Sequence, residues 1–340
     1  MSQTLSFENI DSPELYIRNS DNLTLADNPI QELIDTPLPE YNQYVDKIDT
    51  GRRSDLDTNY GKYWERQVVM SDGQKHTEIL GLSTKTEADE LAVSIPAWWT
   101  RLDGGVNKVT SDELLKSGKH TLIKGVSENQ PSSLSRGAYD LHTVLSFDNN
   151  DGLGYYFDSQ KIYVHGDSNG AMQGTGVIAY APNFDREIID AYLVDPCIPH
   201  KINCSDIKKA LEHPTYVPKE LLSLTRQIGR MMISSDLSLS EYSKSVENDP
   251  KRILGNLMLS KALFSGEFGS LLAHLPPEQN EHFVIFKHSL ANQKQFFIKI
   301  LESIGSKATV NIRTGTHASI ADPRILADKI SYLTKSSVNA

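Results

Sequence analysis

The chain has 340 residues and a net charge of −10, and its 39% hydrophobic and 23% charged residues are typical of a soluble globular protein. Lys and Arg are scattered along the sequence, which argues against a nucleic-acid groove or a patch for anionic membranes. No stretch approaches the ~20 consecutive apolar residues of a membrane span, and the polar, acidic N-terminus is unlike a signal peptide, so we expect a cytoplasmic protein.

Residues 1–55 are polar and acidic, and prolines at positions 13, 29, 37 and 39 interrupt them. We interpret this segment as an N-terminal arm or a short helical lead-in. Such an arm is a candidate for dimerisation or docking, so a homo-oligomer remains an open alternative.

Strand-like and helix-like segments alternate from about residue 60 onward. Two strand-like runs, at 64–70 and 75–82, are joined by Asp72-Gly73, a dipeptide typical of a hairpin turn. Further strands are expected at 90–99, 119–126, 161–166, 189–196, 281–289 and 308–315. Helices are expected at 111–118, 133–147, 170–184, 293–305 and 322–335. This alternation favours a mostly parallel sheet with helices on both faces.

Two details refine this pattern. The helix at 111–118 should begin at an N-cap, Ser111, and end at Gly118. From residue 204 to about 280 the alternation stops, because every segment there has helical spacing or helix-end signals. The sequence therefore predicts a helical insert between two strand–helix units of one sheet.

One short motif lies at the junction of a predicted strand and a predicted helix. Residues 166–170 read GDSNG, which matches the G-x-S-x-G pattern of a nucleophile elbow. Such a turn imposes strained backbone angles on its serine, Ser168, and holds the hydroxyl in the open. Side chains at Gly166 and Gly170 would collide with the adjacent strand and helix. Ser168 is therefore a candidate nucleophile.

This arrangement resembles the α/β-hydrolase superfamily over about residues 60–338. The elbow after the fifth expected strand, the strand order and a late histidine carry the resemblance. It implies an α/β-hydrolase fold in which residues 1–55 are an arm and residues 56–199 and 281–340 form the hydrolase core. Residues 200–280 would be a helical cap inserted after the sixth strand.

The resemblance also implies a catalytic triad in the chain order serine, acid, histidine. His317, at a Gly-rich turn after the last strand, would be the general base. The usual acid position follows the seventh strand, but no Asp or Glu occurs there. Asp195, at the end of the sixth strand, is the candidate acid, and the alternative interpretation is an aspartate that caps the turn. A carboxylate of the insert, such as Asp236 or Glu267, or a Ser–His dyad, is a further alternative.

An oxyanion hole would need two backbone N–H donors. The resemblance assigns them to Asn169, at the start of a helix, and to Trp98, in the loop after the third strand. The histidines lack metal-binding spacing, and no phosphate-binding or dinucleotide-binding motif is intact. We therefore expect no metal and no cofactor.

Together these features predict a serine hydrolase that cleaves an ester, thioester or related acyl bond through an acyl-enzyme. Its partner would be a small or medium apolar acyl substrate, and neither a nucleic acid nor a membrane. The same architecture could serve an acyltransferase. A non-catalytic ligand-binding protein on the hydrolase fold is an alternative of another class, and the missing acid after the seventh strand favours it.

Overall fold

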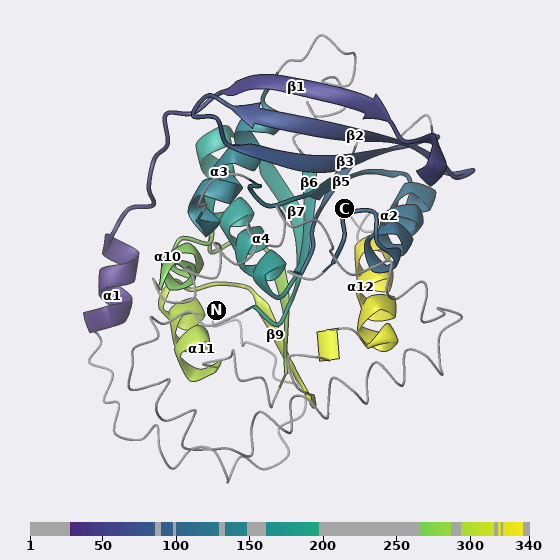
Figure 1. Ribbon diagram of the computed structural model, residues 1–340. Coiled ribbons are helices and arrows are strands. Elements are labelled where there is room, and N and C mark those ends of the chain that lie inside the picture. The colour runs from purple at the N-terminus through teal and green to yellow at the C-terminus, as the bar shows by residue number, and fades with distance from the viewer. Residues whose placement is uncertain are drawn as a thin grey trace, which may run out of the picture.

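The computed structural model describes residues 28–85, 90–97, 100–128, 133–147, 161–196, 266–286, 294–315, 319–320 and 322–335 (Figure 1). Nine strands of these residues form one sheet. In chain order they are β1 (Val45–Arg52), β2 (Gly61–Met70), β3 (Lys75–Ser83), β4 (Glu90–Ile95), β5 (Lys119–Lys124), β6 (Lys161–Asp167), β7 (Glu187–Val194), β8 (Glu281–Phe286) and β9 (Thr309–Arg313).

The strands lie side by side in the order β1-β2-β3-β5-β4-β6-β7-β8-β9. The pairs β1–β2, β2–β3 and β3–β5 are antiparallel. From β5 to β9 all neighbours are parallel. The sheet is therefore mostly parallel, as the alternation in the sequence predicts.

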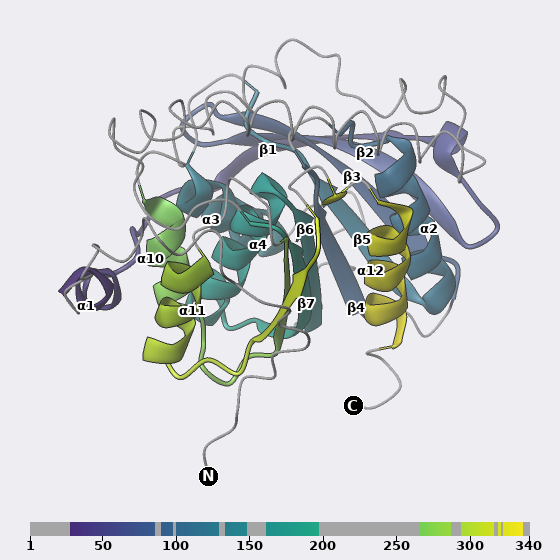
Figure 2. The ribbon, with the colours of Figure 1, turned by 90° about the horizontal axis from the view of Figure 1, so that it is seen from below.

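Helices cover both faces of this sheet. They are α1 (Asn28–Asp35), α2 (Gly105–Ser117), α3 (Leu134–Leu145), α4 (Asn169–Tyr180), α10 (Glu267–Ala273), α11 (Lys294–Ser303) and α12 (Pro323–Lys335). Two short 3₁₀ helices, η2 (Ser54–Leu56) and η4 (Ala181–Phe184), complete the described elements. Helices α3, α4, α10 and α11 lie on one face and α2 and α12 on the other (Figures 1 and 2). The three-layer arrangement is the one expected from the sequence.

The parallel strands are apolar on both sides because helices pack against both. In β6, Ile162 and Val164 belong to the core beneath α3 and α4, whereas Tyr163 belongs to the core beneath α12. All three side chains are fully buried. This burial holds the carboxyl end of β6 in a fixed position, and the GDSNG motif begins there.

The hairpin between β2 and β3 forms where Asp72-Gly73 predicts it. Gly73 has φ 85°, and its N–H donates to the Met70 carbonyl at 2.8 Å. The strand before it, β1, was not expected, because the sequence analysis assigned residues 1–55 to an arm. β1 is an edge strand whose charged residues face outward, so it lacks the apolar alternation of a half-buried strand.

Two helices also differ from expectation. α2 begins at Gly105, six residues before the expected start, and Ser111 is buried within it, with its Oγ 2.5 Å from the Thr121 Oγ1. Its end at Gly118, which has φ 101°, is as predicted. α10 falls within the range expected to be cap, yet Phe268 and its neighbours pack into the main core. Residues 200–265 of the expected insert lie outside the described residues.

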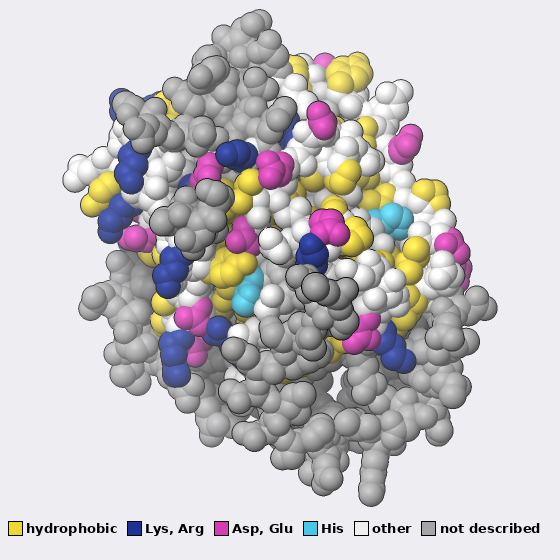
Figure 3. Space-filling model, turned by 180° about the vertical axis from the view of Figure 1, so that it is seen from behind, with side chains coloured by type: hydrophobic (Ala, Val, Ile, Leu, Met, Phe, Trp, Pro, Cys, Tyr) yellow, Lys and Arg dark blue, Asp and Glu magenta, His cyan; other side chains and the backbone are white. Residues whose placement is uncertain are grey.

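The described surface carries charges of both signs. On the face in Figure 3, Lys and Arg side chains lie among Asp and Glu side chains.

Among the described residues, no helix has both the length and the hydrophobicity that crossing a bilayer requires.

Candidate active site

The GDSNG motif forms a sharp turn from β6 into α4. Ser168 lies between them with φ 58° and ψ −120°, and it is the N-cap of α4. Positive φ is rare for a residue with a Cβ atom and costs of order 1–3 kcal/mol, so the surrounding structure must hold it. The Ser168 N–H donates to the Val194 carbonyl of β7 at 2.8 Å, and its own carbonyl accepts the N–H of Ala171 at 3.0 Å. These bonds fix the strained residue at both of its peptide groups.

Glycine is required on both sides of Ser168. A Cβ atom at Gly166 would lie less than 3.0 Å from the backbone of Gly170 and Ala171, in α4. A Cβ atom at Gly170 would lie less than 3.0 Å from the carbonyl oxygens of Ile95 and Pro96, at the end of β4. The turn therefore allows the helix to approach two strands more closely than any side chain permits.

Asp195 follows β7 and is completely buried, with φ 45°. Its N–H donates to the Val284 carbonyl at 2.6 Å, and its Oδ1 accepts the Phe286 N–H at 3.1 Å, both in β8. The preceding carbonyl, that of Val194, is the one that accepts the Ser168 N–H. Asp195 and Ser168 thus lie at the same edge of the sheet, on neighbouring strands.

His317 lies outside the described residues, and the nearest described residues on either side are Gly315 and Ser319. Gly315 follows β9 with φ 156° and packs closely against Ser319 and Phe286, since a Cβ atom there would come within 3.0 Å of both. Phe286 is also the residue whose N–H binds the Asp195 carboxylate. Gly315 therefore lies at the end of β8, where Asp195 is bound, and Ser319 lies against Gly315.

Of the two expected oxyanion donors, the structure describes one. Asn169 is the first residue of α4 and is fully buried. A backbone N–H in the first turn of a helix has no partner within that helix, and the helix dipole makes the position favourable for negative charge. Trp98 lies outside the described residues, although Pro96, two residues before it, contacts the elbow at Gly170.

Asp167, the residue before Ser168, forms a buried ion pair that the sequence analysis missed. The Lys329 Nζ of α12 donates to its Oδ2 at 2.7 Å, and the two side chains are 3% and 12% exposed. The partners are 162 positions apart, so no local pattern connects them. The available signal was that Lys329 lies between Ile325 and Leu333 at helical spacing, where an apolar residue would be expected on a buried face.

Three other histidines are structural residues. His165 in β6 is buried, and burial, with Lys329 as a second cause, lowers its pKa well below the usual range. Burial lowers the pKa of His142 in α3 to about 4, and its Nε2 lies 2.7 Å from the Val177 carbonyl. His120 in β5 accepts the Ser83 N–H through Nδ1 at 3.1 Å.

The alternative acid Glu267 has another role. Its carboxylate accepts the N–H groups of Leu134 and Ser135 at 3.2 and 2.9 Å, so it caps the start of α3. Asp236 lies outside the described residues. Within the described ranges, no group of three His, Cys, Asp or Glu side chains is placed to hold a metal ion.

No family model and no curated protein matches the chain. Solved structures do match it. An enol-lactonase from Burkholderia xenovorans LB400 aligns with a TM-score of 0.53 and 13% identity, over 77% of this chain and 97% of that one. An esterase from Pyrococcus furiosus gives 0.49 and 13%, over 87% and 97%. Brefeldin A esterase, described as a bacterial homologue of human hormone sensitive lipase, gives 0.48 and 14%, over 91% and 82%.

At such identities a likeness shows the fold. The chain has the α/β-hydrolase fold, and β1, a strand that was not expected from the sequence, lies at one edge of the sheet. Because of that strand, the fifth strand expected from the sequence is β6 and the sixth is β7. Ser168 and Asp195 follow these two strands at their carboxyl ends.

Proposed function

We propose that this chain is a serine-dependent carboxylic ester hydrolase with Ser168 as its nucleophile. The observation that carries the proposal is the backbone of Ser168, which is held at φ 58° between β6 and α4 by two glycines that leave no room for a Cβ atom. A protein retains such strain where the serine has a use.

In the proposed reaction the Ser168 Oγ attacks the carbonyl carbon of the ester, and His317 takes the hydroxyl proton as general base. The carbonyl oxygen gains a negative charge, which the N–H groups of Asn169 and Trp98 stabilise. His317 then gives its proton to the departing alcohol, and an acyl-enzyme remains. Water, deprotonated by His317, releases the acid and restores Ser168.

Asp195 would orient His317 and stabilise its imidazolium. The support for this role is that Asp195 is buried at the end of β7 and that Gly315 and Ser319, on either side of His317, approach the same end of β8. A carboxylate of this kind holds the imidazole in the tautomer that can accept the serine proton.

The alternative is a non-catalytic ligand-binding protein, and the absence of Asp and Glu from 283 to 301 is the observation that favours it. An acyltransferase would share the acyl-enzyme and differ only in the acceptor. Both alternatives differ from the proposed hydrolase when water is the only acceptor, because only a hydrolase then turns over its substrate efficiently.

The test is hydrolysis of p-nitrophenyl esters of rising chain length. We expect turnover by the wild type, and a loss of about 10⁶ in kcat for Ser168→Ala with unchanged thermal unfolding. Ser117→Ala is the matched control, because this hydroxyl caps the end of α2 by binding the Leu114 carbonyl at 2.7 Å. Equal activity in Ser168→Ala and the wild type would overturn the proposal.

A further inference from the structure

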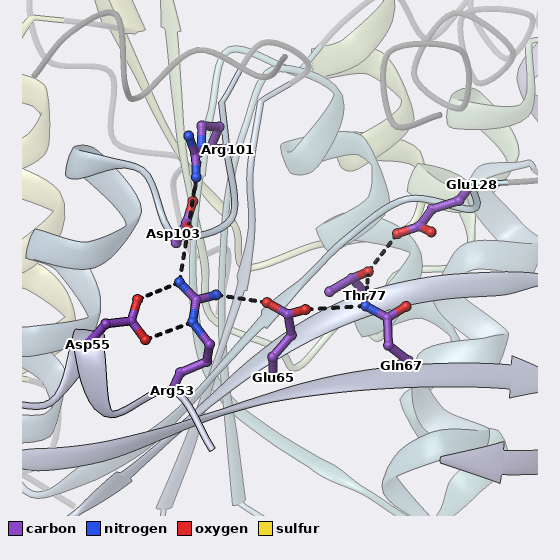
Figure 4. A network of polar contacts seen from close by, with 8 residues as sticks. All are labelled: Arg53, Asp55, Glu65, Gln67, Thr77, Arg101, Asp103 and Glu128. Carbon is purple, nitrogen blue, oxygen red and sulfur yellow. Dashed lines mark hydrogen bonds and ion pairs between the residues drawn. The ribbon is translucent and has the colours of Figure 1, made fainter. Parts of the chain in front are cut away.

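We propose that Arg53 is a positioning residue for the loop between β4 and α2, of which residues 96, 97 and 100–104 are described. The catalytic consequence rests on the proposed function, since the resemblance places one oxyanion donor in this loop. The physical basis is a set of ion pairs that joins the loop to the end of the edge strand β1 (Figure 4).

The loop begins against the nucleophile turn. The Pro96 carbonyl lies so close to Gly170 that no Cβ atom fits between them. Further along, Thr100 donates its N–H to the Ala97 carbonyl at 3.1 Å, and Gly104 donates to the Arg101 carbonyl at 3.0 Å. Thr100 is thus hydrogen-bonded to the residue that follows Pro96, and through this bond a shift of residues 100–104 would reach the elbow.

Arg53 directly follows β1 and holds the far end of this loop. Its Nη2 lies 3.2 Å from the Asp103 Oδ2, and its Nη1 lies 2.7 Å from the Glu65 Oε2 of β2. Its Nε and Nη2 bind the two oxygens of Asp55 at 2.9 and 2.8 Å. Figure 4 shows the guanidinium between these three carboxylates, which come from η2, β2 and the loop.

Asp103 is held from a second side. The Arg101 Nε and Nη2 donate to its two oxygens at 2.9 and 3.0 Å, so this carboxylate binds both arginines. Burial would raise the pKa of Asp103, but the hydrogen bonds from Arg101 and Arg53 lower it below the usual value. Asp103 is thus a charged anchor at ordinary pH.

Isolated surface ion pairs contribute little to stability, whereas networks with fixed geometry contribute more. The side chains of Arg53 and Asp103 are only 23% and 17% exposed, and each has more than one charged partner. The three partners of Arg53 lie in different directions around one planar group. A lysine offers a single point charge on a flexible stem and cannot bind all three in this geometry.

The test compares Arg53→Met and Arg53→Lys with Arg52→Met in the full chain. Arg52 is the matched control because it is the neighbouring residue but pairs with Asp57 at 2.5 Å and stacks on Trp64 at 4.3 Å. Two quantities are measured: kcat and KM with p-nitrophenyl acetate, and hydrogen exchange at the amides of Thr100 and Gly104 without substrate.

We expect Arg53→Met to lower kcat by about 10- to 100-fold with little change in KM, because an oxyanion donor acts mainly in the transition state. Arg53→Lys should be intermediate, and Arg52→Met within about twofold of the wild type. Exchange at the amides of Thr100 and Gly104 should accelerate at least tenfold in Arg53→Met and stay at the wild-type rate in Arg52→Met. Asp103→Asn should act like Arg53→Met, and the double variant should be no worse than either single variant.

The outcomes separate the two proposals. Wild-type exchange at Thr100 and Gly104 in Arg53→Met would overturn the role of Arg53, whatever the protein catalyses. Accelerated exchange with unchanged kcat would show that the tether exists without a catalytic role, and would overturn the proposal as stated. Ester hydrolysis that is unaffected by Ser168→Ala, with accelerated exchange in Arg53→Met, would contradict the proposed function alone.

Discussion

The strained backbone of Ser168 depends on residues that never touch a substrate. Gly166 and Gly170 allow β6, α4 and the end of β4 to approach each other, and the Val194 carbonyl fixes the Ser168 N–H at 2.8 Å. A methyl group at either glycine would push backbone against backbone, where no side chain can move aside. The serine conformation is therefore a property of three elements rather than of one residue.

The variant Asp195→Asn tests whether Asp195 is the acid of the triad. The amide keeps the shape of the side chain and its bond to the Phe286 N–H, so the fold should survive. We expect kcat to fall by about 10⁴, because an amide holds the imidazole in the wrong tautomer. Steady-state kinetics with a p-nitrophenyl ester measures the loss of kcat, and thermal unfolding checks separately that the fold survives.

A negligible loss of kcat in Asp195→Asn would show that Asp195 only caps the end of β7. The reaction would then proceed through a Ser–His dyad or an acid of the insert. Glu267→Gln provides the comparison, because its carboxylate caps α3 and should affect stability rather than kcat.

At the scale of elements, α12 is attached to the nucleophile turn by one buried ion pair. Removing one partner of such a pair leaves an uncompensated buried charge and costs about 3–5 kcal/mol. Lys329→Met should therefore lower the free energy of unfolding by this amount, and Asp167→Asn in the same chain should restore much of it. Urea unfolding gives the free energy of unfolding of the wild type, of Lys329→Met and of the double variant.

Lys335→Met is the control for this experiment, since Lys335 is exposed at the end of the same helix. A loss in Lys329→Met no larger than in Lys335→Met would mean that the Asp167–Lys329 pair does not hold α12 to β6.

The elements also show what a sequence pattern can reveal. The hairpin at Asp72-Gly73 and the strand–turn–helix at GDSNG were predictable because a few adjacent residues determine each. β1 was not, because an edge strand with an exposed side needs little apolar alternation. The start of α2 was misplaced because Ser111 has the chemistry of an N-cap but binds Thr121 inside the fold.

In the candidate site, too, local patterns were predictable and long-range contacts were not. The positions of Ser168 and its glycines follow from a local motif, whereas Asp167–Lys329 and Arg53–Asp103 join residues 162 and 50 positions apart. Such pairs appear only when the chain is folded, since no spacing rule connects their partners.

At the scale of the whole molecule, one buried carboxyl group links stability to pH. Glu281, the first residue of β8, is 1% exposed, and within the described structure neither carboxylate oxygen has a hydrogen-bond partner. Burial raises its pKa from 4.5 to about 8, with Asp190 adding to the effect. In this window the folded chain binds a proton that the unfolded chain releases, so stability falls as the pH rises from about 4.5 to 8.

Glu281→Gln removes this titration. We expect the variant to be more stable than the wild type at pH 8 by on the order of 4 kcal/mol, with the difference vanishing below pH 5. Glu278→Gln is the control, since Glu278 is 81% exposed in its pair with Lys307. Equal pH dependence of unfolding in Glu281→Gln and the wild type would show that Glu281 is ionised in the folded chain.

Covalent labelling shows whether the fold activates the Ser168 hydroxyl. The folded protein is treated with a fluorophosphonate, and the modified peptide is identified by mass spectrometry. We predict one label per chain on Ser168, none in Ser168→Ala, and strongly slowed labelling in His317→Ala. An unlabelled wild type, or labelling that persists in Ser168→Ala, would show that Ser168 is not an activated nucleophile.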